Sequence, residues 1–262
     1  MRTRTLAAAS VVVLAVHVAA HAGQTCEPHK PSTAEIAQAL SLAERTAKTL
    51  DASGAQVVLI ARAGQNLSAY GLRYSHLGYA YRDPDAKAWR IVHKLNHCGT
   101  DHAALYRQGL ADFFMDQPWR YEAGLEIPTP EVQTALLPVL RDNAQAARLH
   151  TPAYSMVAYP WSDRYQQSNQ WALETLALAV DPADVHSRAQ AQAWLRLKGY
   201  RPTTLQLGTF QRLGARLTAA NVAFDDHPDA RRFAGRIDTV TVDSVFAFLH
   251  EVGLAAEPVV VR

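Results

Sequence analysis

Cysteine is scarce in this sequence, and several marks of common protein classes are missing. Only Cys26 and Cys98 occur among 262 residues, which excludes a small fold held together by many disulfides. Positive charge is not in excess either. The formal charge of +2 includes Arg2 and Arg4 near the N-terminus, so the rest of the chain sums to about zero and gives no indication of nucleic-acid binding. No glycine-rich phosphate-binding loop is present, and no cofactor is expected.

Long apolar runs are also rare, and the one that stands out is at the N-terminus. Residues 6–19 are almost entirely apolar, follow a positively charged start and lead into the small-x-small sequence Ala20-His21-Ala22. This order predicts a signal peptide over residues 1–22, cleaved after Ala22, and a periplasmic or secreted protein. The run is shorter than the roughly 20 residues that a membrane-spanning helix needs. No integral membrane segment is therefore expected after cleavage.

Residues 23–262 are predicted to form a single α+β domain with a helix-rich C-terminal third. Ser32 and Glu35 make a capping-box pattern that begins a helix, and residues 56–63 are typical of a buried strand. Two further strands, 75–82 and 88–95, form a hairpin around the turn-forming Asp83-Pro84-Asp85. The remaining expected strands are 121–127, 154–159 and 236–242, and the remaining helices are 103–114, 129–149, 168–180, 182–198 and one ending at 253. The sum is an antiparallel sheet with packed helices.

Two histidines are predicted to meet in this hairpin. His76 shares one face of its strand with the small Gly78, so a helix could approach closely there, and His93 interrupts an apolar face of the next strand. With the turn centred on residues 84–85, opposed residue numbers sum to about 169, which places His76 directly opposite His93. A base oriented by a second polar group is what nucleophilic catalysis requires. The alternative is a pair of core histidines satisfied by hydrogen bonds.

Ser168 is the candidate nucleophile. It lies at the start of an apolar helix, where free backbone N–H groups and the positive end of the helix dipole can stabilise an anion. The alternative is a structural role, because serine is a preferred N-cap residue.

A polar loop carries a second set of candidates. His93, His97, Cys98 and His102, with Asp101, supply the residue types that bind zinc, although their spacing matches no known motif. Cys98 is also a possible nucleophile, but it follows a strand rather than opening a helix. In an oxidising compartment Cys98 could instead pair with Cys26, which would remove its thiolate; pairing and two free thiols both remain open.

The segments RYSHLGYAYRD and SNQW carry two resemblances. They resemble the circularly permuted branch of the NlpC-type cell-wall peptidases, papain-like enzymes in which the histidine strand precedes the nucleophile helix. The chain as a whole resembles an uncharacterised bacterial domain-of-unknown-function family, number 2145, with similar YGLRYSH and SNQW segments. The first resemblance implies a papain-like core in which His76 is the base, His93 is the orienting group and Ser168 replaces the usual cysteine.

Two functions follow from this resemblance. The first is a hydrolase of amide or ester bonds in cell-envelope material, with peptidoglycan peptides as the substrate class and with Ser168, His76 and His93 as its catalytic residues. An alcohol ionises at a much higher pH than a thiol, so serine is a poor replacement for the family's cysteine. The second function is therefore a catalytically inactive module of the same fold that binds a peptide or glycan.

Overall fold

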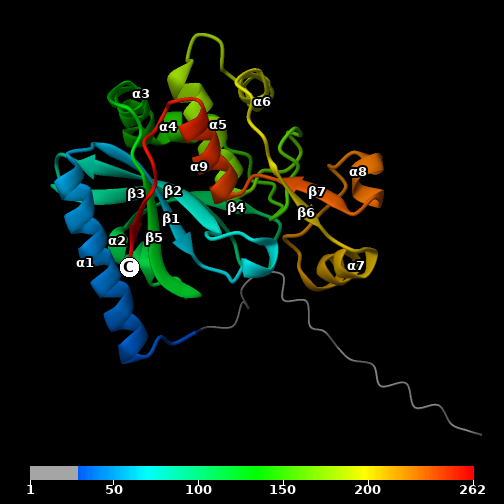
Figure 1. Ribbon diagram of the computed structural model, residues 1–262, viewed down its shortest axis with the longest axis horizontal. Coiled ribbons are helices and arrows are strands. Elements are labelled where there is room, and N and C mark those ends of the chain that lie inside the picture. Colours follow the sequence, from blue (N-terminus) through cyan, green and yellow to red (C-terminus); the bar gives the residue numbers. More distant parts are fainter. Residues whose placement is uncertain (1–28) are drawn as a thin grey trace, which may run out of the picture.

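Six antiparallel strands form the main sheet of the protein (Figure 1). The computed structural model describes residues 29–262, apart from the side chains of Leu217 and Thr218. The strand order is β4-β3-β2-β1-β5-β8, which confirms the antiparallel sheet expected from the sequence. The strands are β1 (Val57–Ala63), β2 (His76–Asp83), β3 (Ala88–Asn96), β4 (Ala103–Gly109), β5 (Arg120–Glu126) and β8 (Val259–Val261).

Helices cover both faces of this sheet. One face packs Leu59, Leu77 and Tyr79 against helices α3, α5 and α9, and the other packs Ile60 and Ile91 against α1 and α2. Because successive strand residues point to opposite faces, the residues of β1–β3 pack alternately into the hydrophobic core on one face and the core on the other. The helices are α1 (Thr33–Ser53), α2 (Leu110–Phe114), α3 (Pro130–Arg141), α4 (Asn143–Ala146), α5 (Ser168–Val180), α6 (Arg188–Leu197), α7 (Thr209–Thr218), α8 (Asp229–Phe233) and α9 (Val242–Glu251).

Local sequence signals account for the well-predicted elements. The capping box of α1 forms as expected: the Glu35 N–H donates to Ser32 Oγ, and the Ser32 N–H donates to Glu35 Oε2. Helix α3 begins with Thr129 as N-cap and Pro130 as its first residue. The β2–β3 turn is fixed by Asp83, whose Oδ1 accepts from the Asp85 N–H at 3.0 Å.

Several expected elements differ in the structure. Residues 103–114 are not one helix but strand β4 followed by the short helix α2, because residues 103–109 pair along their whole length with β3. Residues 154–159 form turns rather than a strand: the N–H groups of Tyr154 and Met156 donate to the loop carbonyls of Asp101 and Asn221. The helix expected towards residue 149 ends at Arg141, and α6 begins only at residue 188.

A smaller structural unit lies beside the main sheet. Residues 203–239, here called the β6–β7 unit, contain strands β6 (Thr203–Gln206) and β7 (Arg236–Thr239) and helices α7 and α8. Figure 1 shows this unit to the right of the main sheet. It has its own small core of Val222, Phe224 and Ile237.

Several expectations from the sequence concern the N-terminus. The predicted signal peptide, residues 1–22, and Cys26 lie outside the described residues. Within residues 29–262, no helix combines the length and apolar character that crossing a membrane would take. Cys98 is disulfide-bonded, and the described part of the chain holds no free cysteine.

Candidate functional site

His76 and His93 form a hydrogen-bonded pair in the sheet. His76 Nε2 lies 2.8 Å from His93 Nδ1, and the two rings are nearly perpendicular. The predicted register is wrong by two residues: Tyr79 pairs with Val92, so the opposed numbers sum to 171 and the imidazoles meet diagonally. A shift by two residues keeps every side chain on its own face, and the rings therefore still meet.

Gly78 makes room for His93. A Cβ atom at Gly78 would lie 2.9 Å from His93 Cβ and 3.1 Å from the Val92 carbonyl oxygen. The small residues of β2 were expected to allow a helix to approach. In the structure the space next to Gly78 is instead filled by the neighbouring strand and its histidine.

Gln108 on β4 completes a chain of hydrogen bonds. Its Oε1 lies 2.8 Å from His93 Nε2, so in this amide orientation His93 donates from Nε2 and its Nδ1 is left as an acceptor. His76 must then donate from Nε2, which leaves a lone pair on His76 Nδ1. This nitrogen has no hydrogen-bond partner among residues 29–262, and His76 keeps 9% of its surface exposed whereas His93 keeps none.

The surroundings keep both imidazoles neutral. Burial, followed by the charge of Arg62, lowers the pKa of His93 to about 3, although the hydrogen bond to Gln108 opposes the shift. Burial, Arg62 and His93 together hold the pKa of His76 well below its usual value. The Arg62 guanidinium lies 4.8 Å from the centre of the Phe113 ring, which also contacts both imidazoles, and it forms an ion pair with Asp116.

Ser168 lies on the other side of the sheet from the histidine pair. It is the first residue of α5, and this helix contacts the face opposite to His76: the Leu77 N–H donates to Asn169 Oδ1 at 3.0 Å, and the Tyr79 hydroxyl donates to the Ala172 carbonyl at 2.6 Å. No hydrogen bond joins Ser168 to either imidazole. None of these contacts brings Ser168 together with the two histidines, because adjacent residues of β2 point to opposite faces.

The start of α5 is also occupied by its own chain. The N-cap is Gln167 rather than Ser168, and the Gln167 side chain accepts from the Asn169 N–H at 3.2 Å. Ser168 is buried, and its side chain interacts with that of Tyr154. These contacts leave little of the helix N-terminus to stabilise an anion.

Lys94 is a buried cation beside the loop that leads into α5, and its role is structural. Its Nζ donates to the Thr151 carbonyl at 2.7 Å and to both the carbonyl and Oε1 of Gln166, at 2.7 and 2.9 Å. Burial and the charge of Arg188 lower the pKa of Lys94, and the charge of Glu174 opposes this shift; three carbonyl oxygens match the three hydrogens of a charged ammonium group. We therefore interpret Lys94 as a charged group that ties β3 to the loop before α5.

The loop candidates do not assemble into a metal site. Within the part of the chain that the structure describes, no group of three or more histidine, cysteine, aspartate or glutamate side chains could hold a metal ion. His93 is bonded to His76 and Gln108, and His102 Nδ1 is bonded to the carboxylate of Asp101. The disulfide at Cys98 removes the thiolate that a zinc site or a nucleophile would need.

Reasoning from the sequence missed four residues of the site: Arg62, Gln108, Phe113 and Asp116. Arg62 could have been identified from the sequence, because it is a charged residue inside an apolar strand. Gln108 and Phe113 were assigned to a helix, so their approach to the histidines could not be anticipated.

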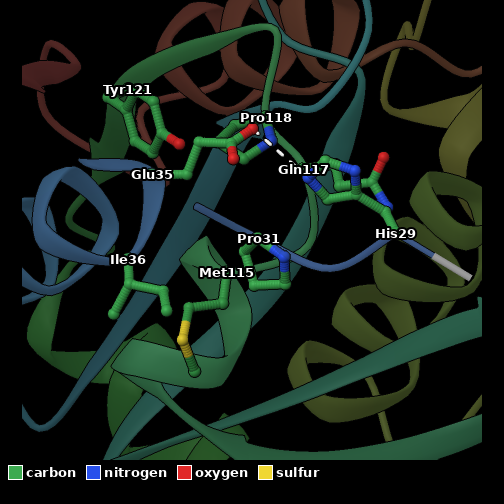
Figure 2. Close-up of a pocket in the computed structure, with 8 residues that line it drawn as sticks. All are labelled: His29, Pro31, Glu35, Ile36, Met115, Gln117, Pro118 and Tyr121. Atoms are coloured by element: carbon green, nitrogen blue, oxygen red, sulfur yellow. Dashed lines mark hydrogen bonds and ion pairs between the residues drawn. The ribbon is translucent and has the colours of Figure 1, made fainter. Parts of the chain in front are cut away.

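A pocket lies beside the segment that contains Met115, Gln117 and Pro118. Figure 2 shows Met115, Pro118 and Tyr121 facing residues from the start of the chain's described part, where His29 Nε2 lies 3.3 Å from Glu35 Oε1. The pocket contains none of the predicted site residues. We therefore place the candidate site at the histidine pair.

One comparison with known proteins gives a match. A family model described as an uncharacterised protein conserved in bacteria matches residues 49–249, which include His76, His93 and Ser168. No curated protein and no solved structure matches the chain.

Proposed function

Because the chain belongs to the DUF2145 family of uncharacterised proteins conserved in bacteria, whose description names no activity, we propose a function from the site itself. The protein is an exported, catalytically inactive module of papain-like fold that binds a peptide or glycan of the cell envelope. The observation that carries this proposal is the position of Ser168, buried on the α5 side of the sheet while both imidazoles lie on the other side. A serine hydrolase needs these groups within hydrogen-bonding distance.

With the Gln108 amide in this orientation, His76 supplies a hydrogen-bond acceptor for such a ligand. The chain from Gln108 through His93 orders the protons so that His76 Nδ1 carries a lone pair. Because the pKa of His76 is held well below its usual value, this nitrogen stays an acceptor throughout the neutral range. Peptide N–H groups and sugar hydroxyls are the matching donors.

Exposed rings lie on the same side of the sheet. Tyr106 pairs directly with His93 in the β3–β4 register, so the two side chains share a face. Tyr106 is 37% exposed, and its ring lies edge-to-face with the exposed His97 ring, with 6.4 Å between centroids. Aromatic faces beside a hydrogen-bond acceptor suit sugar rings and peptide side chains.

Two substitutions of His76 separate the outward acceptor from the internal bond. Gln places its amide nitrogen near the Nε2 position and keeps the donor to His93, but it lacks an acceptor at Nδ1. Asn offers an oxygen near Nδ1 and loses the internal donor. We expect the chain without residues 1–22 to bind purified peptidoglycan sacculi, His76→Gln to weaken binding roughly fivefold, and His76→Asn to keep it.

Ser168→Ala is the control for chemistry. It should leave binding unchanged, and neither the wild type nor the variant should release soluble fragments from sacculi or hydrolyse a nitrophenyl ester. Turnover that is lost in Ser168→Ala would overturn the proposal in favour of a hydrolase. Absence of binding to sacculi by the wild type would overturn it as well.

A further inference from the structure

Helix α7 of the β6–β7 unit turns an apolar face to solvent. Phe210 is 90% exposed and Leu213 is 55% exposed, and residues three apart lie on the same side of a helix. The opposite side carries Ala215 and Ala219, which pack against the small core of the unit. The core therefore uses one side of α7 and leaves the larger apolar side chains without a partner among the described residues.

The acidic groups of the β6–β7 unit are all engaged. Three of its four aspartates form ion pairs with arginines: Asp225 with Arg164, Asp229 with Arg232 and Asp238 with Arg231. The fourth, Asp226, is hydrogen-bonded to His227, and its side chain is buried, so the unit exposes no unpartnered carboxylate that would repel an anion.

Three arginines of the β6–β7 unit have no acidic partner among the described residues. Arg212 and Arg216 lie on α7, which contains no acidic residue, and Arg236 begins β7. None of the three forms an ion pair within residues 29–262. Arg212 donates to the Leu207 carbonyl, and its Nη1 would lie 3.6 Å from a Cβ at Gly235, so it sits beside the start of β7. An apolar helix face thus lies beside unopposed positive charge.

We propose that α7 docks on an anionic phospholipid surface. Phe210 and Leu213 insert at the boundary between headgroups and acyl chains, and Arg212, Arg216 and Arg236 lie near the lipid phosphates. This is how interfacial helices with an apolar face and a basic polar face bind membranes. The unit lies beside the main sheet at one side of the molecule, and Figure 1 shows α7 at the periphery, at the lower right. The proposal does not depend on the function proposed for the histidine pair.

Vesicle binding tests the proposal directly. The chain without residues 1–22 is used, because their apolar run would itself bind lipid, and its partition is measured on vesicles of equal phosphatidylglycerol and phosphatidylcholine and on phosphatidylcholine alone. We expect binding to the anionic vesicles that weakens with added salt. The double variant Phe210→Ser/Leu213→Ser should bind roughly tenfold more weakly or worse, and Arg216→Gln about fivefold more weakly.

Leu197→Ser is the control, since Leu197 is an apolar residue that is 84% exposed, at the end of α6 and outside the β6–β7 unit. It should bind as the wild type does, and thermal unfolding of each variant verifies that it is folded. Equal binding to both kinds of vesicle, no binding to either, or full binding by the folded double variant would each overturn the proposal. So would a concentration-dependent dimer that the double variant abolishes, because the apolar face would then join two copies of this chain.

Discussion

Glu126 on β5 is fully buried, and neither of its carboxylate oxygens has a hydrogen-bond partner among the described residues. Burial, with a smaller contribution from the charge of Glu257, raises the pKa of Glu126 from 4.5 to about 9. The folded protein therefore keeps a proton on this carboxyl across a pH range in which the unfolded chain has released it. The substitution that tests this is Glu126→Gln, which has nearly the same shape and cannot ionise.

The sign and size of the effect follow from proton linkage. Below pH 4.5 both states are protonated and Glu126 carries no penalty. Between pH 4.5 and about 9 only the folded state holds the proton, so the free energy of unfolding falls by about 1.4 kcal/mol per pH unit. From pH 5 to pH 8 the wild type should lose about 4 kcal/mol relative to Glu126→Gln.

Urea unfolding at several pH values measures this difference by linear extrapolation. The stability of Glu126→Gln relative to the wild type should be smallest at pH 5 and should increase steadily to pH 8. Glu131→Gln, an exposed carboxylate at the start of α3, is the control and should show no such trend. Parallel profiles for Glu126→Gln and the wild type would refute the reasoning, because they would mean that Glu126 is ionised or solvated in the folded protein.

Three further substitutions follow from contacts around the site and the sheet. Gly78→Ala should lower the free energy of unfolding by about 1–3 kcal/mol in chemical denaturation, because its Cβ would meet His93 and the Val92 carbonyl; unchanged stability would contradict this. In the wild type, His93 gains a proton below pH 6.5 in the unfolded chain but, with a pKa of about 3, stays neutral in the folded protein, so acid lowers the stability. His93→Gln lacks this group and should therefore lose less stability than the wild type as the pH falls. Identical acid profiles would count against the neutral pair. Glu122→Gln should lower the free energy of unfolding, measured in urea at pH 7, by about 2 kcal/mol. Burial alone would raise the pKa of Glu122, but the hydrogen bonds from Arg73 and Arg262 lower it to about 2. The difference between the variant and the wild type should therefore shrink as the pH falls from 4.5, and a constant difference would argue against this reasoning.

The histidine pair was predictable because it depends on local rules. The Asp83-Pro84-Asp85 turn and the flanking strands set the hairpin, and strand alternation put His76 and His93 on one face. An error of two residues in the register did not matter, since it preserved that alternation. Only the direct opposition of the two rings was lost.

The position of Ser168 was not predictable, because alternation does not say which face a distant helix will cover. Both faces of the hairpin are buried: Leu77 and Tyr79 pack under α5, and even the charged Lys94, on the face of β3 opposite to His93, is completely buried. Only the tertiary arrangement decides which face of the β2–β3 hairpin is covered by α5.

Gln108 was missed for a different reason. Residues 103–109, AALYRQG, contain no β-branched residue and have the composition of a helix, so local propensity favours the wrong structure. Their strand conformation comes from seven consecutive pairings with β3, which no local pattern reveals.

The tautomers of His76 and His93 depend on the orientation of the Gln108 side-chain amide. Rotating the Gln108 amide by half a turn would present its NH₂ group to His93 Nε2, and both imidazoles would then have to exchange tautomers. The outward nitrogen of His76 would change from an acceptor into a donor, with no backbone movement and no change in net charge. Rotation about one side-chain torsion of Gln108, on the edge strand β4, would therefore change whether the surface at His76 binds hydrogen-bond donors or acceptors.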